Sequence, residues 1–237
     1  MARVWKIAIA VGVAAMIGGF GVDASAATRG QQQAVKSTGR VWALVRAGAQ
    51  HACGIRLDHT LWCWGNNRSG QLGIGDTKDR HRPTKVGAAA NWAQVELGTA
   101  HTCGIRFNHS LWCWGNGTYG GLGVGDTSNR LSPTRVGRDG GWVHVQAGYA
   151  DTCATRLDHT LWCWGHNADG DLGVGDAEDR NAPTQAGKGT DWAAVAGGFE
   201  HSCGIRLDRT LWCWGDNGAG ELGLGGTRDR WVPARVS

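Results

Sequence analysis

The strongest constraint on this chain is a segment that occurs four times at a constant spacing of 50 residues. HACGIRLDHTLWCWG at residues 51–65 returns as HTCGIRFNHSLWCWG at 101–115, DTCATRLDHTLWCWG at 151–165 and HSCGIRLDRTLWCWG at 201–215. A fixed period of this length is typical of solenoids and propellers, whose units bury their apolar faces against one another. The copies therefore predict one repeat domain over residues 41–237, with repeats at about 41–90, 91–140, 141–190 and 191–237.

The repeats are expected to be all-β. Forty glycines separate short apolar runs, and residues 41–237 contain no long segment with helical periodicity. Within one unit we predict four strands, at residues 83–86, 91–97, 101–106 and 110–114. The first of these carries a P-T-x-V pattern, and the last two form a hairpin.

The hairpin has a predictable register. If Arg56 pairs with Thr60 across a three-residue loop, Cys53 lies opposite Cys63. Side-chain alternation then puts the cysteines on one face and two tryptophans on the other, and both faces are apolar. Such a sheet needs a neighbour on each side, which stacked propeller blades supply. The third loop position should be left-handed, and the four copies fill it with His59, His109, His159 and Arg209.

All eight cysteines lie in these hairpins, two in each repeat. An even count with opposed partners predicts four disulfides, namely Cys53–Cys63, Cys103–Cys113, Cys153–Cys163 and Cys203–Cys213. Zinc is an alternative, because His51, His101 and His201 lie nearby, but there is no C-x-x-C pair and the third copy has Asp151 instead. These histidines are expected to hydrogen-bond inside their own blade. A redox switch is disfavoured because the four pairs are equivalent.

The N-terminus resembles an export signal. Arg3 and Lys6 precede an apolar run over residues 7–20, and Ala24-Ser25-Ala26 forms an A-x-A site. We therefore predict a signal peptide at 1–26, a flexible leader at 27–40, and a secreted, periplasmic or cell-envelope protein that has no membrane association after cleavage. An uncleaved N-terminal anchor is the alternative. The formal charge of +4 is dispersed, so nothing supports a nucleic-acid partner.

The repeat also resembles a known family. WGNNRSGQLG, WGNGTYGGLG, WGHNADGDLG and WGDNGAGELG follow the hairpins, and this pattern is similar to the RCC1 (regulator of chromosome condensation) repeat, in the cysteine-bearing form of exported bacterial members. The resemblance covers about residues 40–237 and implies a β-propeller of four-stranded blades, usually seven of them.

This chain has only four copies, so its closure is left open by the sequence. The C-terminal VPARV at 232–236 matches the P-T-x-V strand and could complete the first blade. A closed four-bladed ring, a partial propeller and a self-associating form, such as two chains making eight blades, are the alternatives. An open arc would expose apolar blade faces and favour homo-oligomers.

Residues that recur in every copy are expected to build the scaffold. Asp76, Asp126 and Asp176 recur in G-x-G-D, and we interpret them as turn residues that accept backbone N–H bonds rather than as calcium ligands. No nucleophile–base set, metal motif or phosphate loop emerges, so the sequence predicts neither an enzyme nor a cofactor.

Specificity is expected where the copies differ, at residues 49–50, 67–69 and 78–81 and their counterparts. The candidate binding surface consists of Arg68, Tyr119, Tyr149, Phe199, Arg80, Arg130, Arg180 and Trp231. Aromatic and arginine side chains on rigid loops suit contacts with proteins. We interpret the chain as an exported module that binds an unidentified protein partner. One bacterial class of similar proteins acts by inhibition, and by analogy this chain could inhibit an extracytoplasmic protein. The alternatives are a lectin-like module and, less favoured, guanine-nucleotide exchange.

Overall fold

Sixteen strands make up the computed structural model, which describes residues 41–237; the predicted signal peptide and leader lie outside the described residues. The strands are β1 (Trp42–Ala47), β2 (His51–Arg56), β3 (Leu61–Gly65), β4 (Arg80–Lys85), β5 (Trp92–Leu97), β6 (His101–Arg106), β7 (Leu111–Gly115), β8 (Arg130–Arg135), β9 (Trp142–Ala147), β10 (Asp151–Arg156), β11 (Leu161–Gly165), β12 (Arg180–Gln185), β13 (Trp192–Gly197), β14 (His201–Arg206), β15 (Leu211–Gly215) and β16 (Arg230–Arg235). A short 3-10 turn, η1 (Thr118–Gly120), interrupts the loop after β7.

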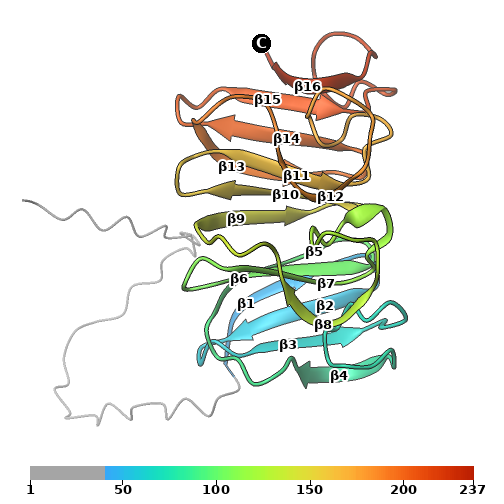
Figure 1. The fold of residues 1–237 in the computed structure, drawn as a ribbon, viewed down its shortest axis with the longest axis vertical. Coiled ribbons are helices and arrows are strands. Elements are labelled where there is room, and N and C mark those ends of the chain that lie inside the picture. The colour runs from blue at the N-terminus through green and yellow to red at the C-terminus, as the bar shows by residue number, and fades with distance from the viewer. Residues whose placement is uncertain (1–40) are drawn as a thin grey trace, which may run out of the picture. The chain divides into compact units, whose positions relative to one another are not determined.

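The strands form four antiparallel sheets of four strands each, in chain order, which are the blades of a β-propeller (Figure 1). Blade 1 holds β1–β4, blade 2 holds β5–β8, blade 3 holds β9–β12 and blade 4 holds β13–β16. The first strands β1, β5, β9 and β13 lie on the inside, where successive ones contact each other. No hydrogen bond among the described residues joins blade 1 to blade 4, so the blades form a partial propeller.

The predicted hairpin register is confirmed. Cys53 pairs with Cys63, and Gly54 pairs with Trp62, in the β2–β3 ladder, and the other three blades repeat this pairing. All four predicted disulfides are present, and no cysteine in residues 41–237 is free. The third loop position also has the expected left-handed backbone, with φ between 59° and 68° at His59, His109, His159 and Arg209.

The position of the P-T-x-V strand was predicted wrongly. This strand does not open the next unit. Thr84 pairs with Cys63, so the segment is the last strand of its own blade. The C-terminal strand β16 likewise pairs with β15 and does not complete blade 1. The physical reason is that the loop at residues 66–79 folds back and returns the chain to the side of β3, with Arg80 opposite Gly65.

Adjacent blades pack through two unlike faces. We call the face that carries the disulfide the cystine face, and the opposite face the tryptophan face. At the first junction Ile55 and Leu61 of the cystine face of blade 1 pack with Trp92, Val95 and Trp114 of the tryptophan face of blade 2. The corresponding residues form the second and third junctions. The hydrophobic core therefore lies between the blades, as the apolar character of both hairpin faces predicted.

Each junction also has buried hydrogen bonds. The carbonyl of Gln71 accepts one from the indole of Trp114 at 3.0 Å and one from the hydroxyl of Thr102 at 2.9 Å. Nε2 of His51 lies 2.8 Å from the same hydroxyl. His101 contacts Thr152 in the same way at 3.0 Å. The prediction that these histidines bond inside their own blade is therefore wrong for His51 and His101, because their partners belong to the next blade.

Candidate functional site

The segments in which the four copies differ lie at one end of the blades. The turn after each first strand and the loop after each third strand are held together by a backbone hydrogen bond, for example from Asn116 to Ala100 at 2.9 Å and from Asp216 to Glu200 at 2.8 Å. We call this end the loop face; it consists of residues 48–50 and 66–81 and their counterparts at intervals of 50. All three variable segments of the sequence belong to it, whereas the hairpin tips lie at the opposite end.

Three of the four long loops of this face are organised by a buried asparagine side chain. In blade 3, Oδ1 of Asn167 accepts a hydrogen bond from the backbone N–H of Leu172 at 3.0 Å. Its Nδ2 donates to the carbonyls of Asp176 and Glu178 at 2.8 and 3.0 Å. Asn67 and Asn217 do the same in their loops, whereas blade 2 has Gly117 at this position. The long loops of blades 1, 3 and 4 are therefore each held together by the hydrogen bonds of one buried side chain.

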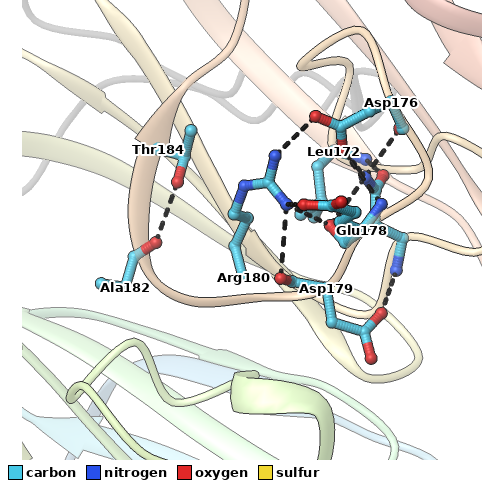
Figure 2. Close-up of polar contacts among 8 residues, drawn as sticks. Leu172, Asp176, Glu178, Asp179, Arg180, Ala182 and Thr184 are labelled. Atoms are coloured by element: carbon cyan, nitrogen blue, oxygen red, sulfur yellow. Dashed lines mark hydrogen bonds and ion pairs between the residues drawn. The ribbon is translucent and has the colours of Figure 1, made fainter.

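The three candidate arginines at the base of these loops take part in this support. Each is half-buried and pairs at 2.6 Å with the carboxylate four positions earlier, Arg80 with Asp76, Arg130 with Asp126 and Arg180 with Asp176. Figure 2 shows that Arg180 also donates to the carbonyl of Glu178, at 2.8 Å. Their guanidinium groups are thus already engaged within the loop.

The recurring aspartates have the role that the sequence predicted for them. Oδ1 of Asp176 accepts a hydrogen bond from the backbone N–H of Glu178 at 3.0 Å, and Asp76 and Asp126 accept equivalent bonds. That bond, followed by the bond from Arg180, holds the pKa of Asp176 below its usual range. Within residues 41–237 no group of three or more His, Cys, Asp or Glu side chains is placed to hold a metal ion.

Three of the candidate aromatic residues come together on the loop face. Tyr149 and Phe199, from the turns of blades 3 and 4, have ring centroids 4.5 Å apart. His166 links Tyr149 to Tyr119 of blade 2, with centroid distances of 6.4 and 4.8 Å. The two tyrosines and Phe199 are exposed. We call these four side chains the aromatic cluster; it spans blades 2, 3 and 4.

His166 was missed by the sequence reasoning. Its position holds Asn66, Asn116 and Asp216 in the other copies, so the difference between copies was the available signal. Only the folded loop shows that its ring lies between two tyrosines 30 residues apart in sequence. Arg68 and Trp231 do not join the cluster. Arg68 is exposed on the loop of blade 1, and Trp231 is the second residue of β16, where it packs against Gly170.

Two hollows adjoin the aromatic cluster. One, of about 390 Å³, is lined by Tyr119 and Tyr149 together with smaller side chains such as Thr99 and Asn116. The other, of about 330 Å³, is surrounded by the turns of all four blades and includes Tyr149 and Phe199. The cluster therefore separates a hollow between blades 2 and 3 from the hollow at the centre of the four blades.

Buried carboxyl groups lie behind the cluster. Nδ1 of His166 is 3.2 Å from Oδ2 of Asp171, and the Asp171 side chain is buried. Burial, reinforced by the charge of Asp151 and further carboxylates, raises the pKa of Asp171 to about 8. Burial also raises the pKa of Asp151 to about 7. Near neutral pH, Asp171 is thus largely protonated, and its carboxyl can donate a hydrogen bond to His166.

Burial has the opposite effect on the junction histidines. It lowers the pKa of His101 to about 4, and it lowers that of His51, with a contribution from the charge of His101, also to about 4. Both imidazoles are therefore neutral at physiological pH. Their contacts with Thr102 and Thr152 therefore join uncharged groups across the blade junctions.

Comparisons with known proteins agree with this architecture. The structure resembles human WBSCR16, with a TM-score of 0.74 and 22% identity over 83% of this chain and 53% of that one. It also resembles yeast RCC1 (Prp20) bound to Kap60, with a TM-score of 0.73 and 22% identity over 83% of this chain and 48% of that one. A further structure, Prp20p from Saccharomyces cerevisiae, has a TM-score of 0.74 and 21% identity over 83% and 50% of the two chains. This chain thus spans about half the length of these structures.

Sequence comparison identifies the repeat directly. A search of curated proteins gave no match. A model of the regulator of chromosome condensation (RCC1) repeat matches residues 58–105, 108–155, 158–205 and 209–237, and a second model of this repeat matches residues 42–71, 92–120 and 192–221. These matches cover most of the chain, and the first three matches of the first model each run from the hairpin of one blade to the hairpin of the next; the chain therefore belongs to the RCC1 repeat family.

Proposed function

We propose that this protein is an exported binding module that recognises a protein partner through its loop face. The observation that carries the proposal is the aromatic cluster, in which the exposed Tyr119, Tyr149 and Phe199 are brought together around the half-buried His166. Large aromatic side chains that are already ordered contribute much contact area at little entropic cost, and they are frequent in protein interfaces.

Export is supported by the sulfur chemistry. Every cysteine in residues 41–237 is in a disulfide, and such bonds persist outside the reducing cytosol. Within the described part of the chain, no helix has the length and apolar character needed to cross a membrane. We therefore place the partner outside the cytosol, and we propose inhibition of an extracytoplasmic protein as the consequence of binding.

The carbohydrate-binding alternative makes a different demand on the loops. A lectin-like propeller would present equivalent pockets on each blade. The positions of Tyr119 and Tyr149 are occupied in blade 1 by Ser69 and Ala49, so the aromatic cluster has no counterpart there. A single asymmetric cluster suits one continuous protein surface better than repeated sugar sites.

Guanine-nucleotide exchange is the third candidate function. Yeast RCC1 (Prp20) was crystallised with Kap60, and binding of Prp20p to Gsp1p and histones has been described. Those chains are about twice as long as this one, and the likeness at 21–22% identity concerns the fold. Exchange on a small GTPase also needs a partner in the cytosol, and an exported protein is not in the same compartment as that partner.

Quantitative pull-down from the native envelope tests the proposal. The double variant Tyr149→Ala/Phe199→Ala should capture the protein partner about tenfold less well, because these two rings form the closest aromatic pair of the cluster and both are exposed. Phe107→Ala is the matched control, since Phe107 is equally exposed but lies on a hairpin tip at the opposite end. Equal capture by wild type and the double variant would contradict the proposal, as would selective binding on a glycan array. The activity of the captured protein, measured with and without this chain, tests inhibition.

A further inference from the structure

The two terminal blades each expose a face that the internal blades bury. Blades 1 to 3 pack their cystine faces on the following blade, and blades 2 to 4 pack their tryptophan faces on the preceding one. Within residues 41–237, the cystine face of blade 4 and the tryptophan face of blade 1 have no such neighbour. Comparing identical positions in different blades shows what is missing.

On the cystine face of blade 4, two aliphatic side chains are open to solvent. Ile205 is 46% exposed, whereas Ile55 and Ile105 at the same position are 3% exposed. Leu211 is 42% exposed, whereas the corresponding Leu61 is fully buried. Because the residue types are the same, the difference arises from the absence of a covering blade.

The tryptophan face of blade 1 shows the complementary deficit. Trp42 is 40% exposed and Val45 is 59% exposed, whereas Trp92 and Val95 at the same positions in blade 2 are 1% and 0% exposed. Trp64 is half-buried, whereas the corresponding Trp114 is completely buried. Blade 1 therefore keeps the side chains of a junction that the described chain does not make.

Blade 4 also keeps the slot that would receive an indole. At the three internal junctions an indole lies over a glycine, with Trp114 on Gly73, Trp164 on Gly123 and Trp214 on Gly173. A side chain at Gly223, the fourth such glycine, would meet only Val236. The adjacent carbonyl of Glu221 corresponds to that of Gln71, which accepts the indole N–H of Trp114 at 3.0 Å. Trp64 is the blade 1 counterpart of Trp114, and its indole N–H makes no hydrogen bond within residues 41–237. This donor could therefore bond to the carbonyl of Glu221 in a second copy.

The polar residues at these faces present no obstacle. Arg46 of blade 1 pairs with Glu96 of blade 2 at 2.8 Å. The residue of blade 4 at the same repeat position is Ala196, which is uncharged, so blade 4 would not bring a positive charge close to Arg46. The hydroxyl of Thr102 is replaced by Ala52 in blade 1, so His201 would lack the contact that His51 makes. A junction between blades 4 and 1 would thus resemble the first internal junction with two hydrogen bonds fewer, because the hydroxyl of Thr102 also donates to the carbonyl of Gln71.

We propose that two copies of this chain associate head to tail, with the cystine face of blade 4 in each copy packed on the tryptophan face of blade 1 in the other. An interface between unlike faces generates a ring when its rotation closes. The aligned part of this chain covers 53% and 50% of two similar structures, so the aligned parts of two copies supply about as many residues as one of those structures. The pair would form an eight-bladed ring from the two sets of four blades. Both loop faces then point in the same direction around the central axis.

This association is independent of the proposed binding function, and its test uses solution mass. The full chain should have twice the mass of its Ile205→Asp variant in light scattering, because a carboxylate at the centre of the buried face opposes association. Leu207→Asp is the matched control. Leu207 is exposed in the same blade, but it lies on the hairpin tip, where Leu57 and Leu157 of the other blades are equally exposed. This control should keep the wild-type mass.

A charge pair tests the pairing of faces. Val45→Lys alone should also halve the mass, and the combination Val45→Lys/Ile205→Asp should restore it at low salt, because opposite charges then meet at both junctions. Thiol counting verifies that every variant keeps its disulfides. If the wild-type protein has the mass of a single chain, the proposal is overturned. That result would mean that the two terminal blade faces are covered within one chain. A mass that rises beyond two copies with concentration would overturn it in favour of open filaments.

Discussion

Nε2 of His51 and Oγ1 of Thr102 lie 2.8 Å apart across the first blade junction, and both side chains are buried. The hydroxyl of Thr102 donates in turn to the carbonyl of Gln71 at 2.9 Å, so it must accept the proton of the histidine. This relay connects β2 and the long loop of blade 1 with β6 of blade 2. It shows that the blades are joined by directional bonds as well as by apolar packing.

Replacing the relay hydroxyl should weaken the junction. Thr102→Val keeps the shape of the side chain but leaves Nε2 of His51 without a partner in a buried site, which costs about 1–3 kcal/mol in the free energy of unfolding. Urea denaturation measures this loss. Thr184→Val is the control, because Thr184 is more exposed and its hydroxyl bonds only to Ala182 of the same strand; an equal loss in both variants would contradict the role of the relay.

The buried histidines should make the fold sensitive to mild acid. The folded-state pKa of His101 is about 4, below its value in the unfolded chain, so protons bind preferentially to the unfolded state. Stability is therefore fully present above about pH 6.5 and is lost as the pH falls toward 4. His101→Gln, which keeps a donor near Thr152, should flatten this part of the profile, whereas the exposed His144→Gln should not. Thermal unfolding between pH 7 and 4 provides the measurement.

Asp171 should have the opposite influence on the alkaline side. Its folded-state pKa of about 8 lies above the unfolded value, so the folded state favours the protonated carboxyl. Its effect on stability becomes more unfavourable as the pH rises from about 4 toward 8. Asp171→Asn should therefore stabilise the protein at pH 9 relative to wild type and have a smaller effect at pH 5. The same substitution at Asp139, which is exposed, should change neither value; a parallel shift in both variants would argue against the assignment.

The hairpin tips offer a stabilising substitution. Arg209 has φ of 68° and is exposed, with no hydrogen bond from its side chain among the described residues. Arg209→Gly should raise the free energy of unfolding by about 0.5–1 kcal/mol, because glycine adopts this backbone without strain. His109→Gly should gain less, since Nδ1 of His109 lies 3.0 Å from the carbonyl of Trp142 in the next blade. Comparing the denaturation midpoints of the two variants tests this ordering.

Much of the hairpin could be predicted from the sequence because its determinants are local. The alternation of side chains places Cys53 opposite Cys63, and the loop length requires a left-handed residue at His59. The candidate site was predictable only in part. Tyr119, Tyr149 and Phe199 were chosen because the copies differ there, but nothing local indicated that they meet, or that His166 lies between them.

The sequence by itself determined the repeat, the strand pairing inside each hairpin and the disulfides, because these depend on residues at most about ten positions apart. Only the tertiary structure decided the partner of His51, the place of the P-T-x-V strand and the gathering of the aromatic cluster. Each of these depends on how a long loop folds back or on how one blade stacks against the next. Such contacts join residues 15 to 51 positions apart, and their geometry is set by the packing of whole blades rather than by any short segment.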